Sequence, residues 1–302
     1  MIVITTPTGD IGHQVLKHVV QGNEPVRVVA RDASRIPQEI RQHIEVIQGS
    51  HGDAATIEKA LSGADALFWL IPPDPFMTLN RVDEAYADFT KPAAKAITKC
   101  AVKRVVSVCG IGRGWNKEAG LATANIKAND VLAGTGVALR SLMMPSFMEN
   151  LLRQAPTIQE KGVFSLPVRA DLKAPLVATS DIATVAAKFL MDATWTGQAD
   201  VPVLGPEDIS PIEMAEILSS VLGRSVRYEQ IPIEAYKARM VSRGMSEAFA
   251  QGLADMMTAK NEGIDNTSSR AIAAKTPTTF RKWSETVLKP AVAGWRCTAT
   301  SS

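Results

Sequence analysis

The first half of the chain alternates short runs of β-forming residues with longer segments of helical periodicity, and this alternation constrains the fold more than any other feature. It is typical of βαβ units, which place parallel strands in one sheet and helices on its faces. The predicted strands are 2–5, 26–30, 45–48, 66–71, 104–109 and 137–142. The helical segments between them are 11–21, 54–62, 76–100 and 122–133. We therefore predict an α/β fold with a doubly wound parallel sheet of the Rossmann type.

After Met144 the pattern changes, because prolines divide the chain into short pieces. Asp181 is suited to cap one helix, and Ser210 begins another, with Pro211 at its first position and Glu213 completing a capping box. The predicted elements of this half are helices 181–192, 234–243, 247–261 and 278–287 and a strand at 226–231. This mixture predicts a smaller C-terminal α+β substrate domain.

The domain boundaries follow from this change of pattern. We predict a dinucleotide-binding domain of residues 1–145 plus about 176–193, and a substrate domain of residues 146–175 and 194–290. The small, polar residues 291–302 predict a flexible tail. Within segment 76–100, Pro92 predicts a kink, or a helix restart capped by Thr90.

Composition excludes several classes of partner. The 302 residues carry a formal net charge of +2, which gives no reason to expect nucleic acid or an anionic membrane. The start of the chain lacks the features of a signal peptide, and the most apolar run is too short to cross a bilayer. The three cysteines form no Cys-x-x-Cys pair, and the four histidines have no metal-ligand spacing, so we expect a cytoplasmic protein without a metal.

The residues between the first strand and the first helix resemble a phosphate-binding turn. They read Thr6-Pro7-Thr8-Gly9-Asp10-Ile11-Gly12. In a dinucleotide site the first glycine makes the tight turn, the second lets the backbone approach the pyrophosphate, and the third lets the helix pack on the strand. Gly9 and Gly12 can fill the second and third roles, and the helix start supplies free amides and partial positive charge.

Thr6 stands where the first glycine is usual. A residue before proline is pushed toward extended conformations, so we expect Thr6 to be extended and the turn to be built without that glycine. The alternative is a tight βα turn that binds no ligand.

The end of the second strand bears on the choice of nucleotide. A carboxylate there favours NAD, whereas an arginine suits the 2′-phosphate of NADP. Arg31 comes first and Arg35 can assist, so NADP(H) is favoured and NAD(H) is the alternative. Asp32 is the competing cue, unless it caps the short helix that follows.

With these residues in hand, the chain resembles the NmrA-like branch of the atypical short-chain dehydrogenase/reductase superfamily. The resemblance covers nearly the whole chain. Beyond the turn and Arg31-Asp32, it rests on the segments 49–53, 145–150, 181–183, 205–207 and 222–224. It implies a Rossmann-type domain, a smaller C-terminal domain and a cleft between them. It also implies either NAD(P)H-dependent reductases of quinones, dyes or polyketide-like carbonyls, or nucleotide-sensing regulators without catalysis. Ser50 departs from the aspartate that the family commonly places near the adenine.

The proton-donating machinery of common short-chain reductases is missing. They use a Tyr-x-x-x-Lys motif with a serine, in which tyrosine supplies the proton and lysine holds the nicotinamide ribose. Here Thr123 and Lys127 occupy the corresponding region, and Cys109 and Gly110 lie where the serine is expected. Lys127 is our candidate for ribose contact or direct proton delivery, against the alternative of an exposed helix residue. Cys109 is best interpreted as a buried apolar residue.

The predicted function is an NADP(H)-dependent oxidoreductase that reduces a small hydrophobic, aromatic or quinonoid carbonyl compound. The alternatives are a redox sensor that binds NAD(P) and a protein partner, and a scaffold that has lost nucleotide binding because of Thr6. The expected cofactor contacts are Thr6, Thr8, Gly9, Asp10, Ile11, Gly12, Arg31, Ser50, Ile71, Pro72 and Lys127. The expected border of the substrate cleft comprises Pro73, Phe147, Met148 and Asn150, with Trp69 beside them.

Overall fold

The computed structural model describes residues 1–72, 74–76 and 80–294. Its main element is a seven-stranded sheet in the order β10-β6-β5-β4-β1-β2-β3. The strands are β1 (Ile2–Thr5), β2 (Val26–Ala30), β3 (Glu45–Gln48), β4 (Ala66–Trp69), β5 (Arg104–Gly110), β6 (Ala138–Met144) and β10 (Gln198–Pro202). All neighbours pair in parallel. The Rossmann-type α/β fold is thereby confirmed.

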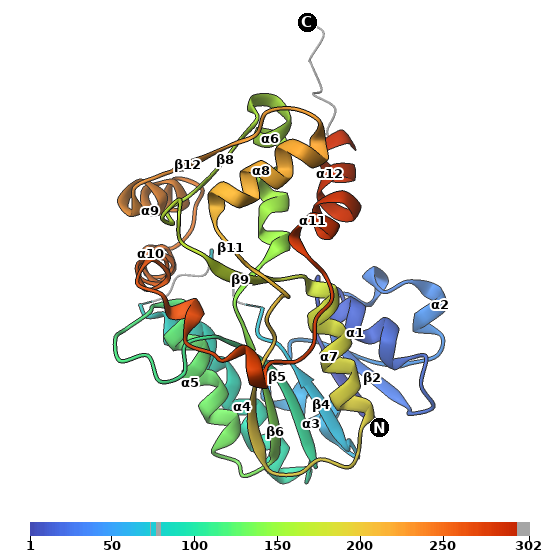
Figure 1. The fold of residues 1–302 in the computed structure, drawn as a ribbon. Coiled ribbons are helices and arrows are strands. Elements are labelled where there is room, and N and C mark those ends of the chain that lie inside the picture. The colour runs from blue at the N-terminus through green and yellow to red at the C-terminus, as the bar shows by residue number, and fades with distance from the viewer. Residues whose placement is uncertain (73, 77–79, 295–302) are drawn as a thin grey trace, which may run out of the picture.

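Helices cover both faces of this sheet. On one face α1 (Gly12–Val19) packs against α7 (Thr179–Met191), and on the other lie α3 (Ala54–Leu61), α4 (Phe89–Lys99) and α5 (Leu121–Ala133) (Figure 1). Each face has its own apolar core, because alternate residues of the buried strands point to opposite sides. The short elements η1 (Ala33–Arg35) and α2 (Gln38–Arg41) lie between β2 and β3.

The smaller unit lies beyond the carboxyl ends of the sheet strands (Figure 1). It contains a three-stranded sheet of β7 (Ser146–Phe147), β9 (Ala174–Val177) and β11 (Asp208–Ile209), and a parallel pair of β8 (Val163–Leu166) and β12 (Arg227–Gln230). Its helices are η3 (Met148–Gln154), α6 (Ala155–Lys161), α8 (Pro211–Leu222), α9 (Ile233–Ser242), α10 (Glu247–Asn261), α11 (Phe280–Trp283), η6 (Ser284–Leu288) and α12 (Lys289–Gly294). Phe164, Phe280 and Trp283 fill its core.

Residues 264–279, with the turns η4 (Ile264–Asn266) and η5 (Arg270–Ile272), run back along the large sheet and join the two units. The amide of Ala274 donates to the carbonyl of Pro202 at 2.8 Å, and the Thr276 hydroxyl donates to the Leu204 carbonyl. Both the amide and the hydroxyl of Thr278 donate to Asp181, at 3.0 and 2.8 Å.

Several expectations are corrected here. Asp181 does not cap α7, which begins at Thr179; it lies in the first turn and accepts hydrogen bonds from Thr278 instead. Pro92 lies inside α4, preceded by the π-helical turn η2 (Glu84–Asp88), and the Thr90 hydroxyl donates to the Tyr86 carbonyl within the helix instead of capping a restart. The capping box of Ser210 and Glu213 is confirmed.

Two predicted boundaries also differ from the observed elements. β10 pairs with β6 in the large sheet, although the predicted boundary at residue 194 assigns it to the substrate domain. The last helix extends as far as Gly294, so residues 291–294 are helical where we predicted a flexible tail, while residues 295–302 lie outside the described residues. No helix among the described residues is long and apolar enough to span a membrane.

Candidate functional site

The strand order reverses between β1 and β4, and ligands of open α/β sheets bind beyond the carboxyl ends of the strands at such a point. The Thr5 hydroxyl holds the two strand ends together. It donates to the carbonyl of Phe68 at 2.9 Å and accepts from the amide of Leu70 at 3.1 Å. The turn after β1 and the segment after β4 therefore lie next to each other at the position where such folds are expected to have their ligand crevice.

The turn after β1 begins with Thr6 in the left-handed region, at φ +52°. The expectation of an extended Thr6 is wrong. This conformation directs the Thr6 carbonyl to the amide of Gly9, which donates to it at 3.0 Å, and so closes the turn that a first glycine usually makes. Among the described residues, the buried Thr6 hydroxyl has no hydrogen-bond partner.

Gly12 fills the role predicted for the third glycine. A Cβ atom at this position would lie 2.0 Å from the Thr6 carbonyl oxygen and 3.0 Å from its hydroxyl. Only glycine lets helix α1 approach the turn this closely. A Cβ at Gly9 would meet the Thr6 carbonyl at 3.6 Å, an ordinary contact, so Gly9 is not required by packing within the protein.

The start of α1 offers unpaired donors. Within the described part of the chain, the amides of Asp10, Ile11 and Gly12 donate no backbone hydrogen bond. The first turn of α1 holds no acidic side chain that would neutralise the partial positive charge of the helix start. Gln14 braces the turn through its amide, which donates to the Asp10 carbonyl at 2.6 Å and to the Thr179 hydroxyl at 3.0 Å. Gly9, Gly12 and the free amides at the start of α1 together form what we call the glycine cradle, and this arrangement fits the diphosphate of a dinucleotide.

At the end of β2, Arg31, which favours NADP, and Asp32, which favours NAD, have different surroundings. Asp32 caps η1, because its carboxylate accepts from the amide of Ser34 at 2.9 Å and from its hydroxyl at 2.6 Å. These hydrogen bonds, the hydroxyl's above all, lower the pKa of Asp32. Arg31 is exposed, and its side chain forms no ion pair with another described residue. The residue that suits a 2′-phosphate is therefore free, and the competing carboxylate is engaged.

The loop after β3 contains a buried histidine. His51 is 6% exposed, and its ring lies 5.0 Å from the rings of both Trp69 and Phe89. Its Nε2 lies 3.0 Å from the Leu70 carbonyl, which only accepts, so Nε2 carries the proton. Burial lowers the pKa of His51 to about 4. Trp69 is 1% exposed, so it belongs to the core and not to the border of a cleft.

Other predicted residues of this region follow β3 and β4. The Ser50 hydroxyl accepts from the amide of Gly52 at 3.3 Å. Directly after β4, Ile71 is buried and Pro72 is exposed. Pro73 lies outside the described residues.

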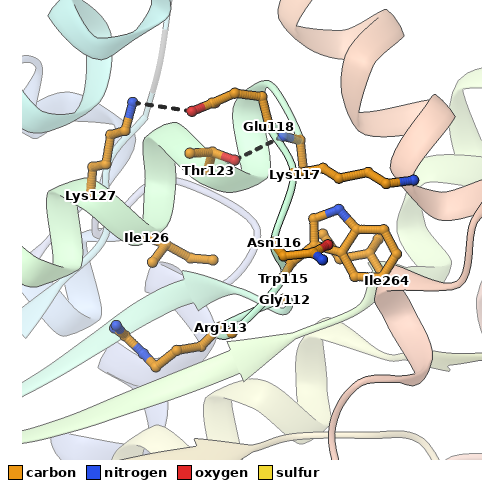
Figure 2. Close-up of a pocket in the computed structure, with 12 residues that line it drawn as sticks. Gly112, Arg113, Trp115, Asn116, Lys117, Glu118, Thr123, Ile126, Lys127 and Ile264 are labelled. Atoms are coloured by element: carbon orange, nitrogen blue, oxygen red, sulfur yellow. Dashed lines mark hydrogen bonds and ion pairs between the residues drawn. The ribbon is translucent and has the colours of Figure 1, made fainter.

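Thr123 and Lys127 border a cavity of about 410 Å³ between α5 and the loop of residues 112–119 (Figure 2). The Thr123 hydroxyl accepts from the amide of Ala119 at 2.8 Å and so fastens this loop to the helix. The Lys127 Nζ lies 3.4 Å from Asp83 and 3.9 Å from Glu118. Lys127 thus lies between two carboxylates, of which Asp83 is half-buried and Glu118 is exposed.

The opposite side of α5 carries a residue that the sequence analysis missed. Asn125 accepts from the amide of Gly110 through Oδ1 at 2.9 Å, at the carboxyl end of β5. One turn on, Asn129 is buried and joins Ser107 of β5, at 2.5 Å, to Ser141 of β6, at 2.7 Å. The spacing of the two asparagines, four residues apart, is the signal that indicates one helix face turned to the sheet.

Cys109 is buried beside this face, as predicted. It is 1% exposed, and burial raises the pKa of its thiol to about 12. A thiol that stays protonated is no nucleophile at neutral pH.

The segment after β6 leads from the sheet into the smaller unit. Phe147 is half-buried on β7 and Asn150 is exposed. Met148 is 2% exposed in the core of the smaller unit, where it contacts no open cleft. Glu149, next to Met148, was not among the predicted residues. Its carboxylate accepts from the amide of Thr179 at 3.0 Å and from the Trp283 indole at 3.1 Å.

Comparison with known proteins places this geometry in a family. The chain matches a family of NAD(P)H-binding proteins over residues 7–192 and the NmrA-like family over residues 133–286. It is 30% identical over 256 residues to an NAD(P)H azoreductase of Xenophilus azovorans, covering 85% of this chain and 86% of that protein.

Two solved structures share the fold. One is an NADPH-dependent quinone oxidoreductase of Escherichia coli in complex with NADPH, with a TM-score of 0.77 and 24% identity over 97% of this chain and 99% of that one. The other is the triphenylmethane reductase of Citrobacter sp. in complex with NADP(H), with a TM-score of 0.78 and 18% identity over 96% and 99%. The extent of the sequence matches shows that the chain belongs to the NmrA-like family of NAD(P)H-binding proteins.

Proposed function

We propose that the protein is an NADP(H)-dependent reductase of a small hydrophobic carbonyl compound, aromatic or quinonoid. The observation that carries this proposal is the pairing of two features at one crevice. The glycine cradle offers unpaired amides after β1, and Arg31 is free at the end of β2 while Asp32 is engaged as a cap. The similarity to an NAD(P)H azoreductase supports the same class of reaction.

The dinucleotide, when bound, supplies a hydride. The chain's own residues bind and orient it. The amides of Asp10 to Gly12 bind the diphosphate, and Arg31 pairs with the 2′-phosphate. We place Thr6, Thr8 and Gly9 along the same turn, Ser50 at the adenine side, Ile71 and Pro72 beside the nicotinamide, and Lys127 at the ribose. Asn125 fixes the end of β5 through Gly110 and keeps the floor of the crevice in place.

The absence of a Tyr-x-x-x-Lys tyrosine on α5 limits the substrates. The Thr123 hydroxyl is engaged with Ala119, and no tyrosine lies on this helix. Tyr228 donates to the carbonyls of Leu166 and Val168, and burial raises the pKa of its hydroxyl to about 12. A conjugated, electron-poor acceptor such as a quinone needs no acid from the protein, because water can protonate the reduced product. This chemistry favours quinonoid acceptors over simple ketones.

We propose that the two units of the chain have separate roles, as predicted from the sequence. The large sheet with α7 binds the nucleotide, and the unit built from η3 to α12 supplies the substrate side. We place Phe147 and Asn150 at the boundary between the two.

Calorimetric titration with NADPH and NADH tests the cofactor assignment. In Arg31→Ala we expect the affinity for NADPH to fall roughly tenfold and the affinity for NADH to stay within about twofold, because one charge-assisted contact is lost. Arg281→Ala, an exposed arginine on α11, serves as the control. Equal affinity of the wild type for both nucleotides would refute the preference for NADP(H).

Stopped-flow oxidation of NADPH by a panel of quinones tests the reaction. The engagement of Thr123 with Ala119 favours one second candidate, a sensor that binds NAD(P) without turnover. Tight binding of NADPH with no acceptor-dependent loss of absorbance would favour the sensor.

A further inference from the structure

The loop of residues 49–53, between β3 and α3, connects the ends of β2 and β4, which are not neighbours in the sheet. At its start the amide of Gly49 donates to the carbonyl of Ala30 at 3.0 Å, at the end of β2. From the same loop, the Nε2 of His51 donates to the carbonyl of Leu70 at 3.0 Å, directly after β4. One short loop is therefore fastened to both strand ends.

The backbone of Leu70 is held by two side chains and not by the sheet. The ladder that β4 forms with β1 and β5 ends at Trp69. Beyond it, the Leu70 amide donates to the Thr5 hydroxyl at 3.1 Å, and the Leu70 carbonyl accepts from His51. Backbone groups that leave a ladder need such partners, because an unpaired group removed from water is costly. Thr5 and His51 thus set the path of the chain as it leaves β4.

The imidazole is fixed in this position by its surroundings. His51 is 6% exposed, and its ring packs edge-on against those of Trp69 and Phe89, with centroids 5.0 Å apart in both pairs. A Cβ atom at Gly52 would lie 2.3 Å from the Phe89 ring, so the loop is pressed closely against α4. Burial lowers the pKa of His51 to about 4, which keeps the ring neutral at physiological pH. The donor to Leu70 is therefore a single N–H group with a fixed direction.

We propose that His51 is a positioning residue, which holds the segment after β4 at the distance from Arg31 that one bound dinucleotide needs to contact both. The proposed site has the 2′-phosphate at Arg31 and the nicotinamide beside Ile71 and Pro72, so the span between these places decides whether one nucleotide reaches both. In this role His51 acts through the Leu70 carbonyl and needs no contact with the nucleotide or the acceptor. This inference rests on the proposed nucleotide binding at the crevice.

Calorimetry with two probes tests this role: NADPH, and adenosine 2′,5′-bisphosphate, which lacks the nicotinamide half. In His51→Leu and His51→Phe, which fill the site without a donor, we expect the affinity for NADPH to fall about tenfold and that for the bisphosphate to stay within about twofold. His51→Gln carries a donor at a similar distance from the backbone, so it should restore NADPH binding to within about threefold of the wild type. Ile97→Ala, which opens a cavity in the same core near the other end of α4, should lower the unfolding temperature and change neither affinity.

Three other results would overturn the positioning role. An equal loss of affinity for both probes would mean that the whole site is disturbed, and an unchanged affinity for NADPH would mean that the segment after β4 keeps its place without the imidazole. A His51→Gln variant as weak as His51→Leu would show that the hydrogen bond is not what matters. If the wild type binds neither probe, the proposed function fails and this inference falls with it. If it binds both probes and reduces no quinone, only the reductase proposal fails, and the comparison of affinities still decides the role of His51.

Discussion

Replacing Thr6 with glycine should stabilise the protein. Thr6 adopts φ +52°, a region that costs an L-residue with a Cβ atom roughly 1–2 kcal/mol. Its buried hydroxyl has no partner among the described residues, and an unsatisfied buried group of this kind costs about 1–3 kcal/mol. Glycine removes both penalties but adds about 0.5–1 kcal/mol of conformational entropy to the unfolded chain. We therefore expect a net gain of about 2 kcal/mol.

Thermal unfolding followed by circular dichroism measures this gain. For a chain of 302 residues, about 2 kcal/mol corresponds to an increase of roughly 3 °C in Tm. Thr6→Val separates the two penalties, because it keeps the β-branched side chain in the strained region and removes only the hydroxyl. We expect it to gain about half as much. Thr8→Gly, at a neighbouring position with ordinary φ, should lose about 0.5–1 kcal/mol.

A Tm for Thr6→Gly at or below the wild-type value would refute the reasoning. It would mean that the left-handed conformation is not strained here or that the hydroxyl is satisfied. A loss of stability in Thr6→Val alone would show that the hydroxyl has a partner, while the strain argument would stand.

Three further changes test the crevice. Gly12→Ala places a Cβ atom 2.0 Å from the Thr6 carbonyl, so the turn must shift, and calorimetry should show at least about tenfold weaker nucleotide binding; unchanged affinity would contradict the cradle. The pKa of His51 is about 4 in the folded state and about 6.5 in the unfolded state. The free energy of unfolding therefore decreases as the pH falls between these two values, and the decrease due to His51 reaches about 2 kcal/mol at pH 5. Denaturant titrations of His51→Asn should therefore show a flatter loss of stability between pH 6.5 and 5 than the wild type, and parallel curves would be inconsistent with a neutral buried imidazole. Lys127→Ala removes only exposed ion pairs, so Tm should change little. Because we place the Lys127 side chain at the ribose, the Kd for NADPH should rise. A large drop in Tm with an unchanged Kd would assign Lys127 a purely structural role.

The central strands of the large sheet were predictable because they are buried on both faces. The predicted ranges of β1, β2 and β3 agree with the structure at every residue, and β4, β5 and β6 differ by two residues or fewer at each end. Short apolar runs bounded by turn residues give a strong local signal for parallel strands. The helices α3, α5 and α10 follow from the same periodicity.

In the smaller unit, β12 agrees with the strand predicted at 226–231, whereas β7, β8, β9 and β11 were not predicted. β7 and β11 have only two residues each. In the large sheet, the edge strand β10 was also not predicted: it is polar and largely exposed, so its place beside β6 depends on tertiary pairing and not on its own sequence. The start of α7 was misplaced because Asp181 is an excellent cap in isolation, while its partner Thr278 lies 97 residues away. Contacts between distant segments leave no periodic signal.

In the candidate site, too, the features set by local sequence were predictable and the others were not. The cradle and the contrast of Arg31 with Asp32 are local patterns, and both were visible in the sequence. The left-handed Thr6 was not, because the preference of residues before proline is overridden here by the closure of the turn. Asn125 was not predicted because it does not occupy a position of the known motif, as Thr123 and Lys127 do, and lies on the opposite side of the same helix.

Glu149 has a consequence for motion. One carboxylate is shared between the start of α7 in the nucleotide-binding layer and the indole of Trp283 in the other unit. A swing of one unit against the other would have to break one of these bonds and leave a charge without its donor. We therefore expect the two units to move little against each other, and the proposed reductase to select its substrate by the shape already present, with little closure around it.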